Sequence, residues 1–194
     1  MGDYFEMLVD PEASLEDSSR LAKAVIRRFR SLGIITGRPN SRCVLGGRGY
    51  LPGPAVRHMY KFSRNEGRFW ELATCGVEPS VGRDFNEMAF GFPFEGLVCP
   101  SCHFQTDDES FKYDYVSAAD KWRRESTMPL VLCPKCTKKY KVIEWNCKPP
   151  VGFGNLSFRF WNWPPLYFPQ WNVDIVAIVR QVTGHEIVYT EGKY

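Results

Sequence analysis

Two short cysteine motifs carry the clearest chemistry in this chain. They are Cys99-Pro100-Ser101-Cys102 and Cys133-Pro134-Lys135-Cys136. A turn of the form CxxC presents two sulfurs to one metal ion, and a structural Zn²⁺ takes four such ligands in a tetrahedron. Two turns fill that shell and leave no position for water. The spacing therefore predicts a zinc site that holds structure and does no chemistry, with four ligands: Cys99, Cys102, Cys133 and Cys136.

Other interpretations of these four cysteines account for less of their spacing. The four could form two disulfides, act as a redox motif of the thioredoxin type, or be unrelated buried thiols. A redox motif needs one CxxC at the start of a helix, whereas here two occur, each after an apolar run. The three remaining cysteines, Cys43, Cys75 and Cys147, are odd in number. Thiolates that bind zinc need a reducing compartment, so we expect the protein in the cytoplasm.

The paired CPxC motifs resemble those of the zinc-ribbon superfamily. The resemblance covers only about residues 97–142 and depends on the two cysteine turns. His103 and Thr137 stand where a glycine often follows the second cysteine of each turn. The resemblance implies a small metal-stabilised module, and neither departure removes a ligand.

Catalytic motifs are weak by comparison. The three histidines, His58, His103 and His185, lie in no metalloprotease or triad-like motif. His185 and Glu186 begin an expected strand, where neighbours point to opposite faces. Pairing of His58 with Cys75 or Cys147 has no local support. We therefore expect no catalytic residue, while an enzyme whose site only the fold assembles stays open.

A glycine-rich loop over residues 46–54 could wrap an anion with its amide groups. It lacks the Lys-Ser/Thr pair of a phosphate-binding loop and the flanks of a dinucleotide fingerprint. A structural turn is the favoured interpretation.

Charge is unevenly distributed although the net charge is only +3. The first 17 residues hold six acidic residues and no basic one, and residues 18–65 hold eleven Lys and Arg with no acidic residue. A helix is expected from the capping signal at Ser14, just before this basic block, to about Leu32. One arc of it is apolar and the other is cationic. The cationic arc is a candidate surface for an acidic protein or for phosphates, or simply a solvated face: Arg20, Lys23, Arg27 and Arg30.

Residues 158–171 are dense in aromatic rings and prolines. Prolines break a strand into a rigid connection, and rings on such a connection often contact a partner. The alternative is that they cap the sheet and wall off the zinc module. The candidates for partner binding are Trp161, Trp163, Tyr167 and Trp171.

The remaining pattern gives the fold. A strand over 4–9, the helix to Leu32 and a strand over 33–36 form one unit, and a strand over 156–160, a helix over 174–183 and a strand over 186–190 form another. Two such units can share one sheet in a split βαβ arrangement with the helices on one side. We expect an α+β fold with a small mixed or antiparallel sheet, because a doubly wound α/β sheet would need more helices.

The zinc module is expected as an insertion. Residues 96–144 form the zinc-ribbon-like module, and residues 1–95 with 145–194 form a discontinuous α+β domain. Inside the insertion, a capping box at Ser117–Asp120 predicts a short helix to about Glu125, and residues 140–145 predict a strand.

These features favour a non-enzymatic zinc-binding protein that recognises another protein, such as an inhibitor or immunity-type protein that masks its partner. The alternative is a nucleic-acid binder that uses residues 18–65 and the zinc ribbon. The modest net charge and the six N-terminal acidic residues, which would oppose a phosphate backbone, favour protein. No apolar run is long enough to span a bilayer, so a membrane partner is not expected.

Overall fold

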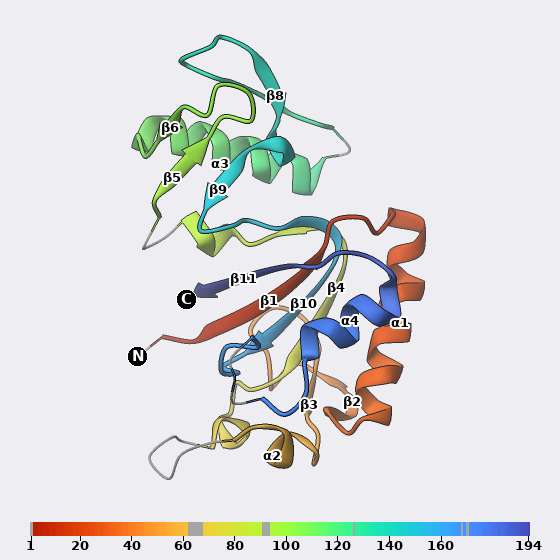
Figure 1. Cartoon of the computed structure of the whole chain (residues 1–194). Helices are drawn as coiled ribbons and strands as arrows, with labels where there is room; N and C mark the ends of the chain where they lie inside the picture. Colours follow the sequence, from red (N-terminus) through yellow and green to blue (C-terminus); the bar gives the residue numbers. More distant parts are fainter. Residues whose placement is uncertain (1, 62–67, 91–93, 126, 168, 170) are drawn as a thin grey trace.

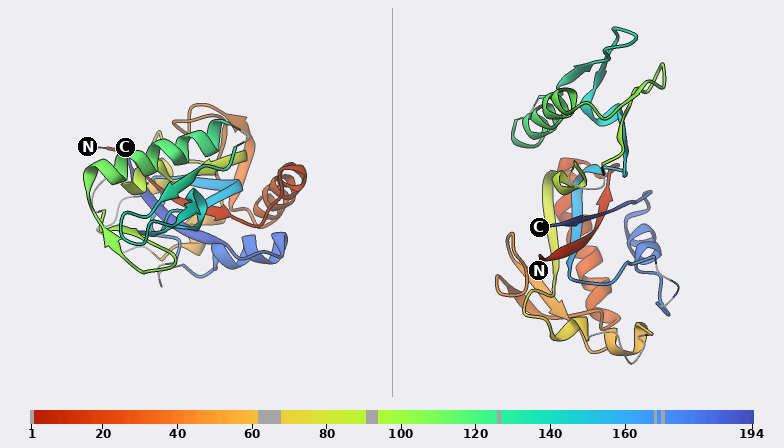
Figure 2. Two further views of the ribbon diagram at one scale, coloured as in Figure 1. Left: turned by 90° about the horizontal axis from the view of Figure 1, so that it is seen from above. Right: turned by 90° about the vertical axis from the view of Figure 1, so that its left-hand side faces the viewer.

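The computed structural model describes residues 2–61, 68–90, 94–125, 127–167, 169 and 171–194. A twisted sheet with helices forms the larger part of the molecule, and a smaller lobe stands at one end of it (Figure 1). The second view of Figure 2 shows the lobe projecting beyond the ends of the sheet strands. No helix within the described ranges has the length and the apolar character that crossing a bilayer requires.

The larger part contains a six-stranded sheet in the order β11-β1-β10-β4-β3-β2, with every neighbouring pair antiparallel. Because β10 and β11 both run antiparallel to the strand between them, they are parallel to each other and joined through a helix. This is the expected split βαβ arrangement, and the α+β fold class is confirmed. The elements are β1 (Tyr4–Asp10), α1 (Leu15–Ser31), β2 (Ile35–Asn40), β3 (Gly49–Pro52), α2 (Val56–Met59), η1 (Phe69–Glu71), β4 (Val77–Phe85), η2 (Glu87–Phe90), β10 (Phe153–Trp161), α4 (Ile175–Thr183) and β11 (Val188–Lys193).

Helices α1 and α4 begin and end at the residues that their capping signals indicate. The Ser14 hydroxyl accepts the Asp17 amide hydrogen at 3.0 Å, and the Asp174 carboxylate accepts that of Ala177 at 2.8 Å. These side chains satisfy amide groups that a helix start leaves unpaired. Helix α4 ends at Gly184, whose φ of 77° is a conformation that glycine adopts without strain.

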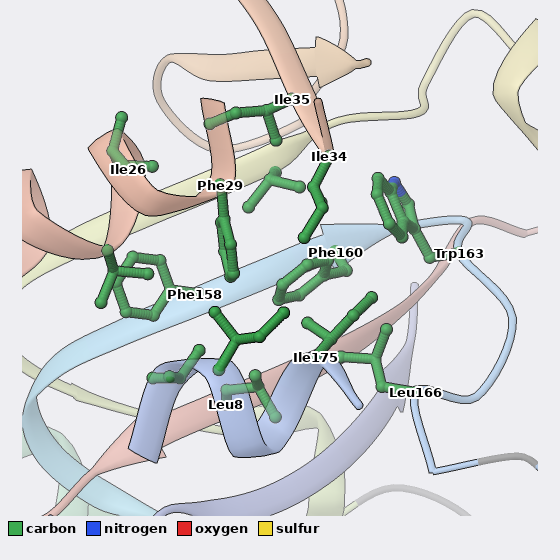
Figure 3. Close-up of a cluster of buried hydrophobic side chains, with 14 of the residues drawn as sticks. Leu8, Ile26, Phe29, Ile34, Ile35, Phe158, Phe160, Trp163, Leu166 and Ile175 are labelled. Atoms are coloured by element: carbon green, nitrogen blue, oxygen red, sulfur yellow. The ribbon is translucent and has the colours of Figure 1, made fainter. Parts of the chain in front are cut away.

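Both helices pack on one face of the sheet, as expected. Figure 3 shows Phe29 of α1 and Ile175 of α4 meeting Phe158 and Phe160, which project from β10. The alternation of strand residues sends Leu8 to this same face. Each of these fully buried side chains contributes roughly 1.5–3 kcal/mol from the area it removes from water.

The chain that precedes β3 packs on the other face of the sheet, where Cys43 and Val44 join the cluster around Phe5 and Trp161. Residues 49–52 of the expected glycine-rich loop form β3 itself, so only its first residues are a turn. The buried carboxylate of Glu78 accepts a hydrogen bond from the Gly47 amide and another, at 2.7 Å, from Trp161 Nε1. A Cβ at Gly46 would lie 2.5 Å from Glu78 Oε1, so a larger residue there would displace this carboxylate. The loop therefore wraps a carboxylate of its own chain, which agrees with a structural turn.

The lobe is built from short strands around one long helix. It contains a three-stranded sheet, β6-β5-β9, and a two-stranded sheet, β7-β8. Its elements are β5 (Gly96–Val98), β6 (Gln105–Thr106), α3 (Glu109–Arg124), β7 (Leu130–Leu132), β8 (Lys139–Lys141), η3 (Val142–Glu144) and β9 (Asn146–Lys148).

Helix α3 differs from its expected bounds. It begins after Asp108 and not at Ser117, because the Asp108 carboxylate accepts the Phe111 amide hydrogen at 2.9 Å and caps the helix a full two turns earlier. The capping-box pattern at Ser117 lies inside the helix. The strand expected over 140–145 is also shorter, since β8 ends at Lys141 and a 3₁₀ turn follows.

The lobe packs on the ends of the two central strands that lead into and out of it. Phe85 of β4 stacks on Phe153 of β10 with centroids 5.2 Å apart, and Trp122 of α3 meets Phe153 edge-on at 5.2 Å. Arg83 Nη1 donates to the carbonyl oxygens of Trp122, Glu125 and Thr127 at 2.9, 2.6 and 2.8 Å. The guanidinium thus joins β4 to the end of α3.

Candidate metal centre

The four cysteines of the two CxxC turns lie together at the tip of the lobe. All four sulfurs lie within 4.8 Å of one another. Across the two turns, Cys99 Sγ is 3.8 Å from Cys136 Sγ and Cys102 Sγ is 3.7 Å from Cys133 Sγ. An ion with four sulfurs at about 2.3 Å in a tetrahedron places those sulfurs about 3.8 Å apart. The structure therefore brings all four expected ligands to the spacing of one tetrahedral metal shell.

The same sulfur–sulfur distances are too long for disulfide bonds between these cysteines. A disulfide joins sulfurs at about 2.05 Å, whereas the close pairs here are almost twice as far apart and each joins one turn to the other.

The backbone of each turn is fixed by two hydrogen bonds. In the first turn the His103 amide donates to the Cys99 carbonyl at 3.2 Å, and the Cys99 amide donates to the Phe104 carbonyl at 2.9 Å. The second turn repeats both bonds, Thr137 to Cys133 at 3.0 Å and Cys133 to Lys138 at 2.9 Å. The two turns are therefore equivalent in construction although their sequences differ.

His103 and Thr137 take the left-handed conformation that glycine favours. Their φ angles are 56° and 58°. A residue with a Cβ pays roughly 1–2 kcal/mol for this conformation. The departure from glycine noted in the sequence therefore leaves the turn intact and adds local strain.

The site is apolar on one side and open on the other. Cys99 and Cys133 are fully buried in the lobe core, Cys136 is half-buried and Cys102 is exposed. Burial raises the pKa of the Cys99 thiol, but the amide groups of Cys102 and Ser101 and the neighbouring thiols lower it, and the balance is about 7. Amide hydrogens that point at a sulfur stabilise its thiolate, which is the form that binds metal.

The four sulfur atoms determine which ions this site can bind and what a bound ion can do. Four sulfur ligands suit Zn²⁺ and other thiophilic ions. A shell completed by protein leaves no position for a substrate or for an activated water, so such a site stabilises the fold and does not catalyse.

The cationic arc of α1 lies in solvent, and most of it borders a groove of about 330 Å³. Lys23, Arg27 and Arg30 line this groove, whereas Arg20 does not and instead forms an ion pair with Asp17 at 2.8 Å. The apolar part of the lining comes from α1, β3 and β4: Ala22, Ile26, Tyr50, Pro79 and Val81. We call this feature the α1 groove.

Trp161 and Trp163 lie in the interior, whereas Trp171 lines a hollow of about 550 Å³ beside Tyr167. Trp161 and Trp163 are fully buried and Trp171 is nearly so, while Tyr167 is 64% exposed. Trp163 stacks on Trp171 with centroids 5.8 Å apart, and Trp171 Nε1 donates to the Pro165 carbonyl at 3.0 Å. The segment turns back onto the sheet, so Trp163 and Trp171 pack in the core while Tyr167 stays exposed. Phe168 and Gln170 of this segment and Arg64 of the basic block lie outside the described residues.

Sequence reasoning missed two buried carboxylates in β1. Asp10 accepts the Ala13 amide hydrogen at 2.9 Å and contacts His185 Nδ1 at 2.9 Å. Glu6 accepts a hydrogen bond from the Tyr189 hydroxyl, and burial, with a smaller contribution from Glu191, raises the pKa of Glu6 to about 8. Charged residues inside an expected core strand were the available signal. Two of the six N-terminal acidic residues are therefore inside the protein.

The three other cysteines are buried and are not part of the four-sulfur cluster; Cys147 lies in the lobe core, and Cys43 and Cys75 lie in the larger part. Burial raises the pKa of Cys75 and of Cys147 to about 12. Neither thiol is therefore activated as a nucleophile.

Comparisons of the chain with protein-family models, with curated proteins and with solved structures found no match.

Proposed function

We propose that this chain is a non-enzymatic, zinc-binding recognition protein that binds an acidic protein partner through the α1 groove. Zn²⁺ has a structural role in a ribbon-like lobe, held by Cys99, Cys102, Cys133 and Cys136. An inhibitor or immunity-type protein, which acts by covering a partner, is the kind of protein that fits this description.

Zinc is the metal we propose because of the ligand type and the spacing. Four thiolates in a tetrahedron with sulfurs 3.7–3.8 Å apart across the turns fit Zn²⁺. The CPxC turns and the short β-hairpin that carries the second one support assignment of the lobe to the zinc-ribbon superfamily. Zinc thiolates need a reducing compartment, which supports a cytoplasmic location.

The composition of the α1 groove is the observation that carries the proposed partner class. Three cationic side chains stand beside an apolar surface that includes the half-exposed Val81. Protein interfaces combine an apolar centre with a polar rim, and charge complementarity selects and steers the partner. An acidic protein segment with apolar side chains meets both requirements.

A nucleic acid fits the groove less well. Phosphate contacts dominate such interfaces and favour a continuous basic surface. Here Arg20 is already paired with Asp17, and Arg30 donates to the Gly37 carbonyl at 3.0 Å while it lies over the Tyr50 ring. Two of the four cations of the arc are thus partly engaged within the chain.

The test is a charge reversal within α1. The chain would be expressed with its neighbouring reading frames, and a stoichiometric partner isolated after nuclease treatment. Arg27→Glu should weaken binding at least tenfold, because like charges then face each other across the interface. Arg28→Glu is the matched control, since Arg28 is exposed on the same helix and does not line the groove.

Equal losses for Arg27→Glu and Arg28→Glu would contradict the proposal, and so would a partner released by nuclease. Binding of mixed DNA and RNA with a steep salt dependence would favour the nucleic-acid alternative.

A further inference from the structure

The β7-β8 hairpin of the lobe carries a second surface that the proposed function does not use. β7 has alternating burial: Val131 enters the lobe core, while Leu130 and Leu132 are 59% and 50% exposed. Two leucines with half or more of their surface in water lie two residues apart on one strand. Single exposed leucines are ordinary, whereas a contiguous pair on a strand is typical of a contact surface.

The strand pairing sets two lysines beside these leucines. Leu130 lies opposite Lys141, and Leu132 lies opposite Lys139. Residues directly opposite in an antiparallel pair share a face of the sheet. The outer face of the hairpin is therefore two leucines on one strand and two lysines on the other.

The outer edge of β7 is open as well as apolar. The Val142 amide donates to the Pro129 carbonyl, and the Cys133 amide donates to the Lys138 carbonyl, so residues 129 and 133 direct their backbone groups toward β8. By the alternation of a strand, the amide and carbonyl groups of Leu130 and Leu132 point to the other side. In the described part of the chain no strand pairs with that side.

The edge of β8 is less available. Its Lys141 amide already donates to a carboxylate oxygen of Glu144 at 2.7 Å. An added strand would therefore pair with β7.

The charge of the hairpin selects what can pair with it. Residues 130–144 contain four lysines and one acidic residue, Glu144. A Zn²⁺ ion with four thiolates carries a net charge of −2, which Lys135 and Lys138, close to the cysteine turn, would offset. The positive charges of Lys139 and Lys141 are then available to attract a ligand. An open strand edge with neighbouring basic side chains favours an extended peptide with acidic residues.

We propose that the β7 edge binds an extended acidic segment of a partner protein by strand addition, with Leu130 and Leu132 contacting its apolar side chains and Lys139 and Lys141 attracting its carboxylates. This surface is separate from the α1 groove, so the inference does not depend on the function proposed for that groove.

The test uses the metal-loaded full chain and a fluorescein-labelled peptide of alternating Glu and Val. Two further probes are the same peptide with a central proline, which removes a backbone donor, and an alternating Lys-Val peptide. Fluorescence anisotropy should show binding of the Glu-Val peptide and at least tenfold weaker binding of the other two. Hydrogen exchange of the Leu130 and Leu132 amides should slow when the Glu-Val peptide binds.

Single substitutions then locate the site. Leu130→Ser and Lys139→Glu should each weaken Glu-Val binding at least fivefold. The controls are Leu15→Ser, since Leu15 is exposed to a similar degree at 57%, and Lys148→Glu, at an exposed lysine of the other sheet of the lobe. One bound metal per chain and an unchanged amide exchange pattern in β5 show that each variant is folded.

Three results would overturn the proposal. The proline-containing peptide could bind as well as the Glu-Val peptide, which excludes strand addition. Arg27→Glu could abolish peptide binding while Leu130→Ser has no effect, which assigns the peptide to the α1 groove. A mixed single-stranded oligonucleotide could protect the Leu130 amide when the Glu-Val peptide does not, which assigns the hairpin to nucleic acid.

Discussion

At the scale of single residues, each cysteine turn contains one residue with a strained backbone conformation. His103 and Thr137 hold positive φ angles that a Cβ disfavours, and both amides close a hydrogen bond to the first cysteine of their turn. The positive φ sets the path of the next residue, and it returns the carbonyls of Phe104 and Lys138 to the amides of Cys99 and Cys133. The turns keep this conformation only if metal binding stabilises the lobe by more free energy than the strain removes.

Thr137→Gly should therefore stabilise the metal-loaded lobe. We expect a gain of about 1 kcal/mol, because glycine adopts positive φ without the Cβ penalty and threonine is β-branched. Chemical unfolding followed by hydrogen exchange in α3 measures the gain. Lys138→Gly, one residue further on at ordinary φ, should instead destabilise, and a loss for both variants would contradict the strain argument.

Cys133→Ser should empty the metal centre. Hydroxyl oxygen is a poor ligand for a thiophilic ion, so bound zinc should fall from about one ion per chain to well below half. Elemental analysis of reduced, dialysed protein measures this. Cys43→Ala, at a buried cysteine of the larger part, should keep the metal. Wild-type protein that holds no metal would contradict the assignment.

At the scale of elements, one side chain fastens the lobe to the sheet. Arg83 caps the end of α3 with three carbonyl contacts, and its guanidinium lies 5.3 Å from the centre of the Trp122 ring. Carbonyl groups at a helix end carry partial negative charge that a cation satisfies.

Arg83→Ala should loosen α3 without unfolding the sheet. We expect a loss of roughly 2 kcal/mol, since a charged donor leaves several acceptors unpaired. Hydrogen exchange should accelerate in the last turn of α3 and stay unchanged in β1. Arg124→Ala removes an exposed ion pair with Asp120 and should cost under about 0.5 kcal/mol. Equal effects of the two variants would mean that Arg83 is not an anchor.

The sequence predicted best the elements whose signals are local. Helix α1 has a cap, an apolar arc and a terminal glycine within one segment, and its bounds are close to those expected. The four sulfurs were found because their spacing within each turn is itself the signal. The bounds of helix α3 were predicted wrongly because two capping signals compete, at Asp108 and at Ser117. Tyr115, which is buried in the lobe core, belongs only to the helix that the earlier signal starts.

The aromatic segment shows what local signals miss. Its prolines left two interpretations open, rings that contact a partner and rings that cap the sheet. The structure folds the segment back, so Trp163 and Trp171 stack in the core. That outcome depends on contacts with distant residues such as Phe69, which no local pattern encodes.

At the scale of the whole molecule, stability should depend on the protonation of Glu6. Its folded pKa of about 8 lies above its ordinary value of 4.5 because the carboxyl is buried and near Glu191. A raised folded pKa stabilises the protein below pH 4.5, and this contribution is lost as pH rises toward 8.

Glu6→Gln should remove that dependence, because the amide keeps the shape and cannot ionise. Between pH 5 and 8 the variant should gain stability relative to the wild type, by a total of roughly 3–5 kcal/mol. Denaturant unfolding at several pH values measures the difference, and the comparison cancels the pH dependence of metal binding that both proteins share. Parallel curves for the two proteins would contradict an ionisable, buried Glu6.

The lobe occupies the connection between β4 and β10, which pair along most of their length. Topologically it is the loop of one very large hairpin, and a long loop makes the meeting of its ends slow and entropically unfavourable. An ion that ties the two cysteine turns together shortens that path in the unfolded chain. Metal binding should therefore change the folding rate as well as the stability of the folded protein. Refolding in the presence of Zn²⁺ should pair β4 with β10 sooner than refolding in a chelator.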